Sequence, residues 1–456
     1  MKRALFALAL LACSGSKAQA PVVNEPVPVG SSTAPRPPPT VDPRDPPANE
    51  RETKHVARTL ARVSALRGIK STKVVPGVRL GRDELIARVK EKALREYPPE
   101  ALKREGQLLQ LVGFAPPTFD YLGEMMKLLE AQLEGFYEPK NGTMYLAADL
   151  HGKEAQATLA HELVHALQDQ KWDLRSRSEY RPGKGDETMA LAALAEGDAT
   201  SVMMDFILRE AGRTALDLQE DMLRELMMSG VNMGDVKSVP HILRTTLIAP
   251  YVDGVAFVHA LRRKGGWTAV DKAWDRPPVT TEQVLHVDKW ESNEKPLEVP
   301  VPTANALGAG WKKEDDDSFG ELGFALTFEE WMEGEDGRIA ASGWGGDRSA
   351  IYVKGEEFGL VVHLRYDPGT PKSDAFAERA MTKLQKAFKK NGQQPAISDA
   401  STVCVDRKDL GPLMFSRSGR EVVMIAGPAK PGSPVWSSTA TCASVKKWAD
   451  EVLAQK

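Results

Sequence analysis

The sequence predicts an α+β protein. A mostly helical domain, with a β-hairpin upstream of its central helix, is followed by a smaller α+β domain at the C-terminus. Two observations favour this class. Apolar residues recur at helical spacing through most of residues 50–290. Beyond residue 300, β-like runs alternate with helical stretches, which is typical of an α+β module. The 456 residues are enough for two or three domains with substantial cores.

The composition is that of a soluble globular protein, with 42% hydrophobic and 27% charged residues. The formal net charge of -3 argues against a surface that binds nucleic acid through bulk positive charge, so we expect no nucleic-acid partner. No glycine-rich loop ends in Gly-Lys-Ser or Gly-Lys-Thr, so no nucleotide phosphate site is expected either. The sequence does not indicate an oligomeric state.

The first residues have the pattern of a targeting signal. A basic start precedes an apolar run that ends at Cys13, and this run is too short to span a bilayer, which needs roughly 20 residues. The stretch Leu10-Leu-Ala-Cys13 resembles the lipobox of bacterial lipoproteins. It implies a lipoprotein signal peptide at residues 1–13 and an exported protein that a lipid on Cys13 anchors to the cell envelope, facing the periplasm or the cell surface. Plain secretion after Ala20 and a buried cytosolic helix are the alternatives.

Residues 14–50 are expected to be a disordered tether, because they are rich in proline and almost lack large apolar side chains. A proline-containing stretch at 296–302 is the expected boundary between two folded units, residues 51–298 and residues 299–456. The first unit carries the candidate chemistry, and the second is the smaller α+β domain. The sequence leaves open whether the early helices inhibit the site as a propeptide would.

Periodicity in the first unit predicts helices at residues 50–66, 82–97, 118–133, 153–170, 186–211, 214–228, 251–263 and 268–274. The pair Pro98-Pro99 is expected to stop the second of these helices. Two β-like runs at residues 135–139 and 143–147 flank Asn141-Gly142, which is a strong hairpin signal. A hairpin is therefore expected directly before the helix at 153–170.

In the second unit, strands are expected at residues 350–353 and 359–365 and near Val403, Leu413 and Val422, with helices at 325–332, 373–390 and 441–454. Cys404 lies in a β-like run, and Cys442 opens the last helix. In an oxidising compartment these two cysteines can form a disulfide that joins the helix to the strand. Two buried free thiols are the alternative.

The stretch His161-Glu-Leu-Val-His165 carries two histidines one helical turn apart. Both imidazoles then project from the same side of the helix and can bind one metal ion. Glu162 lies beside them, where a general base can take a proton from a metal-activated water. The alternative is a helix whose histidines face solvent or bond to backbone carbonyls.

A catalytic zinc needs a third protein ligand, and Glu196 is the best candidate. It ends a run of small apolar residues in a helix that is expected to be buried, and a buried carboxylate needs a partner. Gly197 and its small neighbours are expected to let this helix approach the histidine helix. Asp198, Thr200 and Asp169 are candidate partners for the histidine N–H groups. A helix-terminal Glu196 near solvent is the alternative.

With Glu196 downstream, the His161-Glu-x-x-His165 pattern resembles the gluzincin class of zinc metallopeptidases. Four blocks are similar to those of a largely uncharacterised family of bacterial and archaeal surface metallopeptidases: EGFYEP at 134–139, HELVHALQDQ at 161–170, EGDA at 196–199 and TEQVLH at 281–286. The resemblance covers about residues 80–290 and implies a zincin-like catalytic domain. Val287 stands where relatives often have proline. A further similar block, GWGGDR at 343–348, has no evident mechanism.

The resemblance also implies how a substrate is held. In zincins an edge strand before the metal helix pairs with the extended substrate, and residues 143–147 are expected to be that strand. Gluzincins stabilise the oxyanion with a Tyr or His downstream of the third ligand. The candidates are Tyr251 and His286, which rank equally, and His241. For each of them, a purely structural role is the alternative.

Together these features predict a membrane-tethered, extracytoplasmic zinc metallopeptidase that cleaves peptide or protein substrates. One Zn²⁺ per chain would be held by His161, His165 and Glu196, with Glu162 as general base toward a zinc-activated water. The alternative from another class is a lipoprotein binding or assembly module on a zinc-peptidase fold with little or no turnover, which the intact Glu162 disfavours. A metal-free envelope scaffold is the third hypothesis. The sequence does not identify the substrate or the cleavage specificity.

Overall fold

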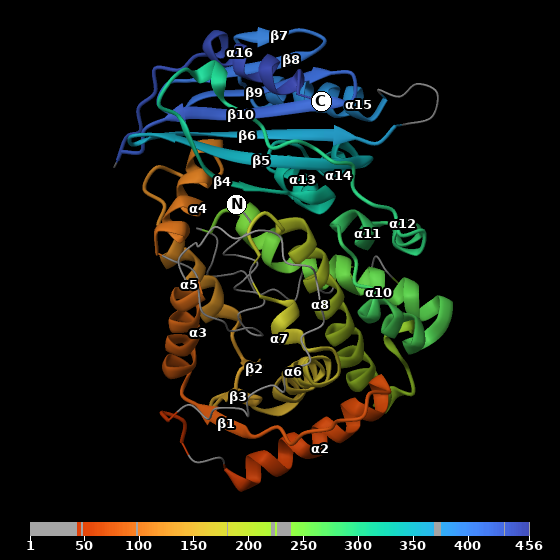
Figure 1. The fold of residues 1–456 in the computed structure, drawn as a ribbon. Coiled ribbons are helices and arrows are strands. Elements are labelled where there is room, and N and C mark those ends of the chain that lie inside the picture. Colours follow the sequence, from red (N-terminus) through yellow and green to blue (C-terminus); the bar gives the residue numbers. More distant parts are fainter. Residues whose placement is uncertain are drawn as a thin grey trace, which may run out of the picture.

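The computed structural model describes residues 43–46, 49–96, 99–179, 181–219, 224–225, 239–368, 375–432 and 434–455. The fold is α+β, as predicted. A seven-stranded sheet lies at one end of the molecule and helix α2 at the other, with the remaining helices and a small sheet between them (Figure 1). Cys13 and most of the expected tether lie outside the described residues. Within the described ranges, no helix is long and apolar enough to cross a membrane.

The N-terminal helices are α2 (Glu50–Arg67), α3 (Arg82–Glu96), α4 (Pro99–Val112) and α5 (Tyr121–Gln132). Helix α2 starts where the Asn49 side chain accepts the N–H of Arg51, and it ends at Gly68, whose φ of 75° is left-handed. Helices α2, α3 and α5 confirm the predicted periodicity. Helix α4 was not predicted. Helix α3 is described as far as Glu96, and Pro99 is the first residue of α4, because proline is tolerated at the first helical position.

The small sheet contains β1 (Gly77–Leu80), β2 (Gly135–Glu138) and β3 (Thr143–Ala147), in the order β1-β3-β2. Strands β2 and β3 form the predicted antiparallel hairpin. Strand β1 pairs with β3 in parallel, so β3 is the central strand. The prediction that residues 143–147 form the edge strand is therefore wrong, because a short strand from elsewhere in the chain covers that side. The edge strands are β1 and β2.

The central helices are α6 (Gly152–Trp172), α7 (Leu174–Arg177), α8 (Gly185–Leu208) and α10 (His241–Asp275), with the short 3₁₀ turns η1 (Arg209–Ala211) and η2 (Ala215–Asp217) after α8. Helix α10 joins the two helices predicted at 251–263 and 268–274 and extends toward the N-terminus, with a break at Gly265 and Gly266. The helix predicted at 214–228 begins instead as the turn η2 followed by extended backbone. Most of the remainder of that range lies outside the described residues.

After α10 follow α11 (Thr281–Leu285) and α12 (Val287–Glu291), and then the C-terminal region, which begins with η3 (Asn305–Leu307). Its seven antiparallel strands are ordered β4-β5-β6-β10-β9-β8-β7. Their bounds are β4 (Lys312–Asp317), β5 (Trp344–Lys354), β6 (Glu357–Tyr366), β7 (Ile397–Ser398), β8 (Thr402–Arg407), β9 (Gly411–Ser418) and β10 (Glu421–Ala429). The helices are α13 (Gly320–Glu329), α14 (Asp336–Ala341), α15 (Ala375–Lys390) and α16 (Cys442–Leu453). A disulfide joins Cys404 on β8 to Cys442 on α16, so the free-thiol alternative does not hold.

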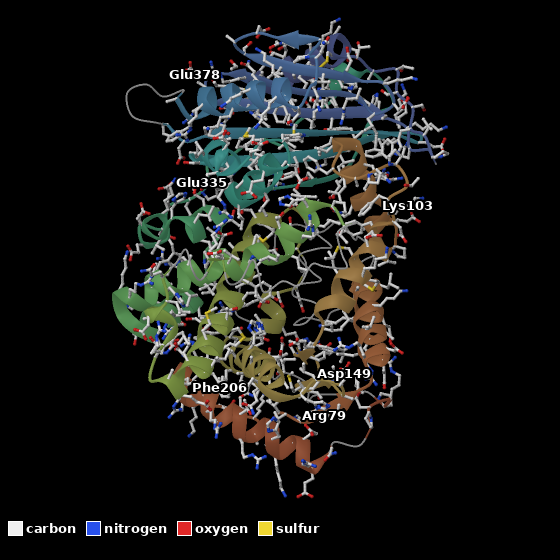
Figure 2. The ribbon with its side chains drawn as sticks, turned by 180° about the vertical axis from the view of Figure 1, so that it is seen from behind. Arg79, Lys103, Asp149, Phe206, Glu335 and Glu378 are labelled. Atoms are coloured by element: carbon white, nitrogen blue, oxygen red, sulfur yellow. A yellow bond between two sulfur atoms is a disulfide. The ribbon has the colours of Figure 1, made fainter. Side chains whose placement is uncertain are left out.

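Two apolar cores cover the two faces of the large sheet. Helices α13, α14 and α15 pack against one face and α16 against the other. Helix α4 also enters the first of these cores through Leu108, Leu111 and Val112. From behind, α4, marked by Lys103, is seen to run up to the large sheet (Figure 2). The contacts between the predicted units therefore include a helix from the early part of the chain, and their boundary near residue 298 stays a prediction.

The GWGGDR block at 343–348 connects the large sheet to neighbouring elements. The Asp347 carboxylate accepts the backbone N–H groups of Phe319 and Gly320, which begin α13, at 2.7 and 2.9 Å. Gly346 packs so closely that a Cβ on it would lie 2.3 Å from the carbonyl oxygen of Leu297. Arg348 donates to the carbonyl of Gly183, just before α8. The block thus ties the large sheet to the loop that leads into one of the central helices.

Candidate metal centre

Helix α6 brings His161 and His165 to one point, as their spacing predicts. Their Nε2 atoms lie 3.2 Å apart, and their rings meet edge to face. The opposite side of the helix is fully buried through Leu159, Leu163 and Leu167, so packing fixes the direction in which the two imidazoles project.

Glu196, on α8, completes this group. Its Oε2 lies 3.0 Å from His161 Nε2 and 3.4 Å from His165 Nε2, and the residue is only 1% exposed. The alternative of a solvent-facing Glu196 does not hold. Burial would raise the pKa of this carboxyl, but its interactions with the two imidazoles lower the pKa to about 2. Glu196 is therefore an ionised carboxylate beside two imidazoles.

Gly197 does allow a close helix contact, but with a different partner from the one predicted. A Cβ at Gly197 would lie 2.2 Å from the carbonyl carbon and oxygen of Gly254 on α10. The glycine therefore sets the approach of α8 to α10, not to the histidine helix. Helices can only come this close where no Cβ intervenes, so both positions of the pair Gly197–Gly254 require glycine.

The three side chains fit a metal ion. Their candidate ligand atoms all lie within 4.8 Å of one another. A neutral imidazole nitrogen and a carboxylate oxygen both offer lone pairs, and three such groups in one buried place need a cation or shared protons between them. Two nitrogens and one oxygen are also a usual set for catalytic zinc, which leaves a further position open.

Glu162 is turned toward β2. Its Oε2 accepts the backbone N–H of Tyr137 at 3.0 Å, so this carboxylate is held by strand β2 and is not one of the three candidate ligands. Burial raises the pKa of the Glu162 carboxyl above its ordinary value, against the opposing effect of the two imidazoles. A carboxylate with a raised pKa is a stronger base than a carboxylate with the ordinary pKa.

The predicted partners of the histidine N–H groups are not confirmed as such. His165 Nδ1 lies 2.8 Å from Oε1 of Gln168, a residue that the sequence did not single out. Asp198 is linked to His165 through Gln168, because its Oδ2 accepts an N–H of the Gln168 amide at 3.3 Å. Asp169 accepts the Tyr137 hydroxyl at 3.1 Å and the backbone N–H of Arg175 at 3.2 Å. The Thr200 hydroxyl is buried, and it has no hydrogen-bond partner among the described residues.

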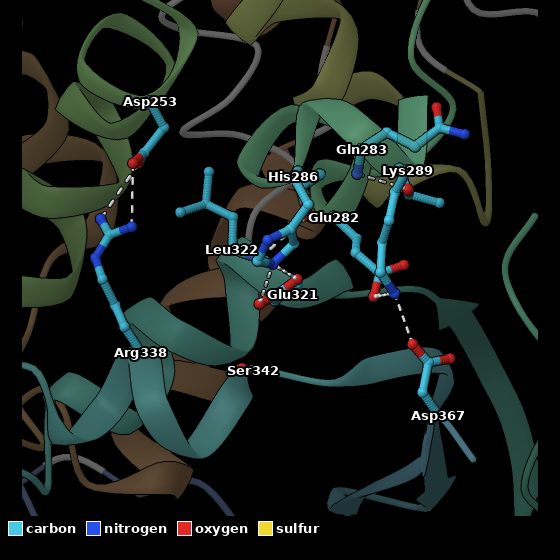
Figure 3. Close-up of polar contacts among 12 residues, drawn as sticks. Asp253, Glu282, Gln283, His286, Lys289, Glu321, Leu322, Arg338, Ser342 and Asp367 are labelled. Carbon is cyan, nitrogen blue, oxygen red and sulfur yellow. Dashed lines mark hydrogen bonds and ion pairs between the residues drawn. The ribbon is translucent and has the colours of Figure 1, made fainter. Parts of the chain in front are cut away.

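The three oxyanion candidates differ in what their side chains contact. The Tyr251 ring, on α10, stacks on the His161 ring with centroids 5.9 Å apart. His286 Nε2 lies instead 2.9 Å from Glu321 Oε2. Figure 3 shows the contact between these two side chains. His241 Nδ1 lies 2.8 Å from Glu330 Oε1. Tyr251 thus contacts a candidate ligand, whereas the two histidines pair with carboxylates of the C-terminal region.

A second group of possible ligands was missed in the sequence. Carboxylate oxygens of Glu282, Glu294 and Asp367 also lie within 4.8 Å of one another. Here the Lys289 ammonium lies between them, 2.6 to 2.7 Å from all three. Figure 3 shows Lys289 with Glu282 and Asp367. Burial would lower the pKa of Lys289, but its hydrogen bonds to the three carboxylates raise it above the usual range. The signal was weak, because the three acids come from separate elements.

Comparison with known proteins adds one match. The model of a family described as a domain of unknown function (DUF8575) matches residues 307–433, which include β4 to β10 but not the candidate metal centre. No curated protein and no solved structure matches the chain. The similarity therefore concerns the large sheet and its helices, and it assigns no activity.

Proposed function

We propose that this protein is a zinc metallopeptidase, with the ion held by His161, His165 and Glu196 and with Glu162 as the general base. One observation carries the proposal: three lone-pair donors meet in a buried place, and a second buried carboxylate lies beside them without joining them. A site that only held a structural ion would have no use for this additional carboxylate, whose burial costs free energy.

The chemistry that a bound zinc ion supplies is Lewis acidity, which lowers the pKa of water to about 7 and polarises a carbonyl. Glu162 would receive the proton of the attacking water at its carboxylate and pass it to the leaving amine. The burial of Glu162 supports this role, because it raises the pKa of the carboxyl toward neutral pH, where a general base is most effective. The N–H of Tyr137 holds one carboxylate oxygen and so orients the group.

For the substrate we propose an extended peptide along β2. The carbonyls of Glu134 and Glu138 accept N–H groups from the β3 side of the hairpin, at Ala147 and Gly142. The N–H and C=O groups of successive residues in a strand point to opposite sides, so those of Tyr137 point away from β3. That is the side on which Glu162 lies. A peptide bound beside this strand would run past the general base without using the Tyr137 N–H, which Glu162 already occupies. Tyr251, stacked on His161, is the proposed oxyanion donor.

The test replaces Glu162 by Gln. General-base assistance is worth roughly 10²–10⁴-fold, so Glu162→Gln should slow cleavage of an unfolded protein by that factor while its zinc content and melting temperature stay close to the parent's. The matched control is Glu187→Gln, the same change near the start of α8, where Glu187 pairs with Arg181 and Lys184 at the surface. The control should cleave like the parent.

Two outcomes speak against the proposal in different ways. Cleavage by Glu162→Gln at the parental rate would remove Glu162 from the mechanism. A zinc-loaded parent that cleaves no unfolded substrate would instead favour a binding or assembly module on the same fold.

We also propose that a lipid on Cys13 anchors the protein to a membrane. The support is the sequence pattern, since Cys13 lies outside the described residues. Cys13→Ser should move the protein from the detergent phase to the aqueous phase in a detergent-partitioning experiment. Identical partitioning of the two forms would contradict the anchor.

A further inference from the structure

We propose that Gln168 is a positioning residue that fixes the tautomer of His165, and that a buried Arg67–Asp198 ion pair fixes the orientation of Gln168 itself. This inference rests on the proposed zinc site and adds the residues that prepare one of its ligands.

The surroundings of the Gln168 amide decide which way it points. Its Nε2 donates to the carbonyl oxygen of Ala195 at 3.0 Å and to Asp198 Oδ2 at 3.3 Å. A carbonyl and a carboxylate can only accept hydrogen bonds, so the amide nitrogen must face them. The flipped amide would place oxygen against two oxygens in a fully buried position. The amide oxygen therefore faces His165.

The oxygen of Gln168 then determines the state of the imidazole. Oε1 lies 2.8 Å from His165 Nδ1, and because an amide oxygen only accepts, Nδ1 must carry a hydrogen. In a neutral ring the lone pair is then on Nε2, the atom that faces His161 and Glu196. The other tautomer would present an N–H to the ion and could not bind it.

Asp198 is held in place from two further elements. Its Oδ1 lies 2.6 Å from Nε of Arg67, and its Oδ2 accepts the indole N–H of Trp274 at 2.9 Å. The side chains of Arg67 and Asp198 are both 0% exposed. Arg67 also lies 2.8 Å from Asp271 and packs over the Trp267 ring at 4.5 Å. The contacts thus run from the last residue of α2 through Asp198 and Gln168 to His165.

The same contacts explain why the residue is a glutamine. The position needs an acceptor toward His165 and a donor toward Asp198, and an amide supplies both. These contacts also imply that α2 belongs to the mature folded domain and is not a removable propeptide. An inhibitory propeptide would have to leave, and removing α2 would leave Asp198 as a buried carboxylate without its arginine.

The test compares three variants of the full chain. Gln168→Leu removes the acceptor at Nδ1. Gln168→Glu keeps an acceptor there but loses the amide donor toward Asp198. Gln170→Leu is the matched control, because Gln170 on the same helix hydrogen-bonds to the 71–73 segment and not to a ligand. Zinc affinity is measured by competition with a chelator of known affinity, and ligand geometry by the absorption spectrum of the Co²⁺ form. Thermal stability of the metal-free form is recorded alongside.

Gln168→Leu should weaken zinc binding by about 10–100-fold and alter the Co²⁺ spectrum. Gln168→Glu should lower the thermal stability but keep zinc affinity close to the parent's, and Gln170→Leu should keep both the affinity and the spectrum. A merely structural role would lower the stability of both Gln168 variants and leave affinity and spectrum unchanged. The inference is overturned if Gln168→Leu binds zinc like the parent, or if Gln168→Glu loses as much affinity as Gln168→Leu. A parent that binds no zinc would overturn the proposed function itself.

Discussion

Two places in the described part of the chain bring three metal-ligating side chains within 4.8 Å of one another. At one of them, Glu282, Glu294 and Asp367 surround the ammonium group of Lys289. At the other, His161, His165 and Glu196 contact one another directly. Close carboxylates alone thus do not indicate a metal site, because the chain can supply the cation itself.

Charge and ligand type separate the two groups further. The first consists only of carboxylates, two of which are partly exposed to solvent. The second combines two imidazoles with a buried carboxylate, and the buried Glu162 lies beside it. Imidazole nitrogen favours zinc, whereas carboxylates alone favour calcium or magnesium. With neutral imidazoles, the charges of Glu162 and Glu196 would balance that of a divalent ion.

The largest effect is expected when a proposed ligand is removed from the candidate metal centre. Glu196→Ala should lose its zinc and with it the zinc-dependent stabilisation, about 4 kcal/mol when free zinc exceeds the dissociation constant a thousandfold. Metal content and thermal unfolding with and without zinc measure this. Glu294→Ala, in the lysine group, is the control and should keep its zinc. Full zinc occupancy in Glu196→Ala would remove Glu196 from the ligand set.

Removing the built-in cation should cost less and leave the metal centre intact. Lys289→Met leaves three adjacent carboxylates without their ammonium and should lower the free energy of unfolding by about 3 kcal/mol, the lower end of the range for a broken buried pair, since Lys289 is partly exposed. Denaturant titration measures the loss, and metal analysis checks that zinc is retained. Stability equal to the parent's would show that the carboxylates do not need Lys289.

The same variant can turn the first group into a cation site. Three carboxylates without a lysine are ligands that Ca²⁺ accepts. Calcium at tenfold its dissociation constant should therefore stabilise Lys289→Met by about 1.4 kcal/mol. The parent should not respond, because Lys289 already occupies the space between the acids. A calcium-dependent melting temperature in the parent, or none in the variant, would contradict the comparison.

The smallest effect concerns a histidine that pairs with an acid instead of a metal. The hydrogen bond from His286 to Glu321 raises the pKa of His286 above 6.5, and burial only partly offsets this. The stabilisation is therefore complete below pH 6.5 and is lost as the pH rises through the folded pKa. Because His286 is 40% exposed, we expect only a few tenths of a kcal/mol. The stability difference between the parent and His286→Asn should shrink between pH 6 and pH 9, and a constant difference would contradict the pairing.

Local sequence was sufficient for much of the fold. The period of the apolar residues predicts α2, α3, α5, α6 and α8, and Asn141-Gly142 predicts the β2–β3 hairpin. It could not predict β1, because a strand of four residues has too short a pattern and its partner is distant in the sequence. Without β1, the sequence predicts β3 as an edge strand, whereas the edges of the small sheet are β1 and β2. The sequence does not predict α4, because Pro98-Pro99 indicates a helix stop, whereas Pro99 also begins the next helix.

For the candidate site, too, local sequence predicts what lies within one helix but not the contacts between distant elements. The spacing of His161 and His165 and the apolar surroundings of Glu196 predict that these groups meet, since both signals lie within one helix each. The partner of His165 could not be predicted, because the role of Gln168 depends on Asp198 from α8 and on Arg67 from α2. A glycine in mid-helix predicts a close contact at Gly197, but only the packed structure identifies Gly254 as its neighbour.

The central claim, a zinc ion at His161, His165 and Glu196, is tested most directly by metal analysis of the purified protein. After saturation with zinc and dialysis against a weak chelator, elemental mass spectrometry should find one zinc ion per chain in the parent. In the double variant His161→Ala/His165→Ala it should find none. A parent chain that retains no zinc under these conditions, or a double variant that retains as much as the parent, would contradict the account.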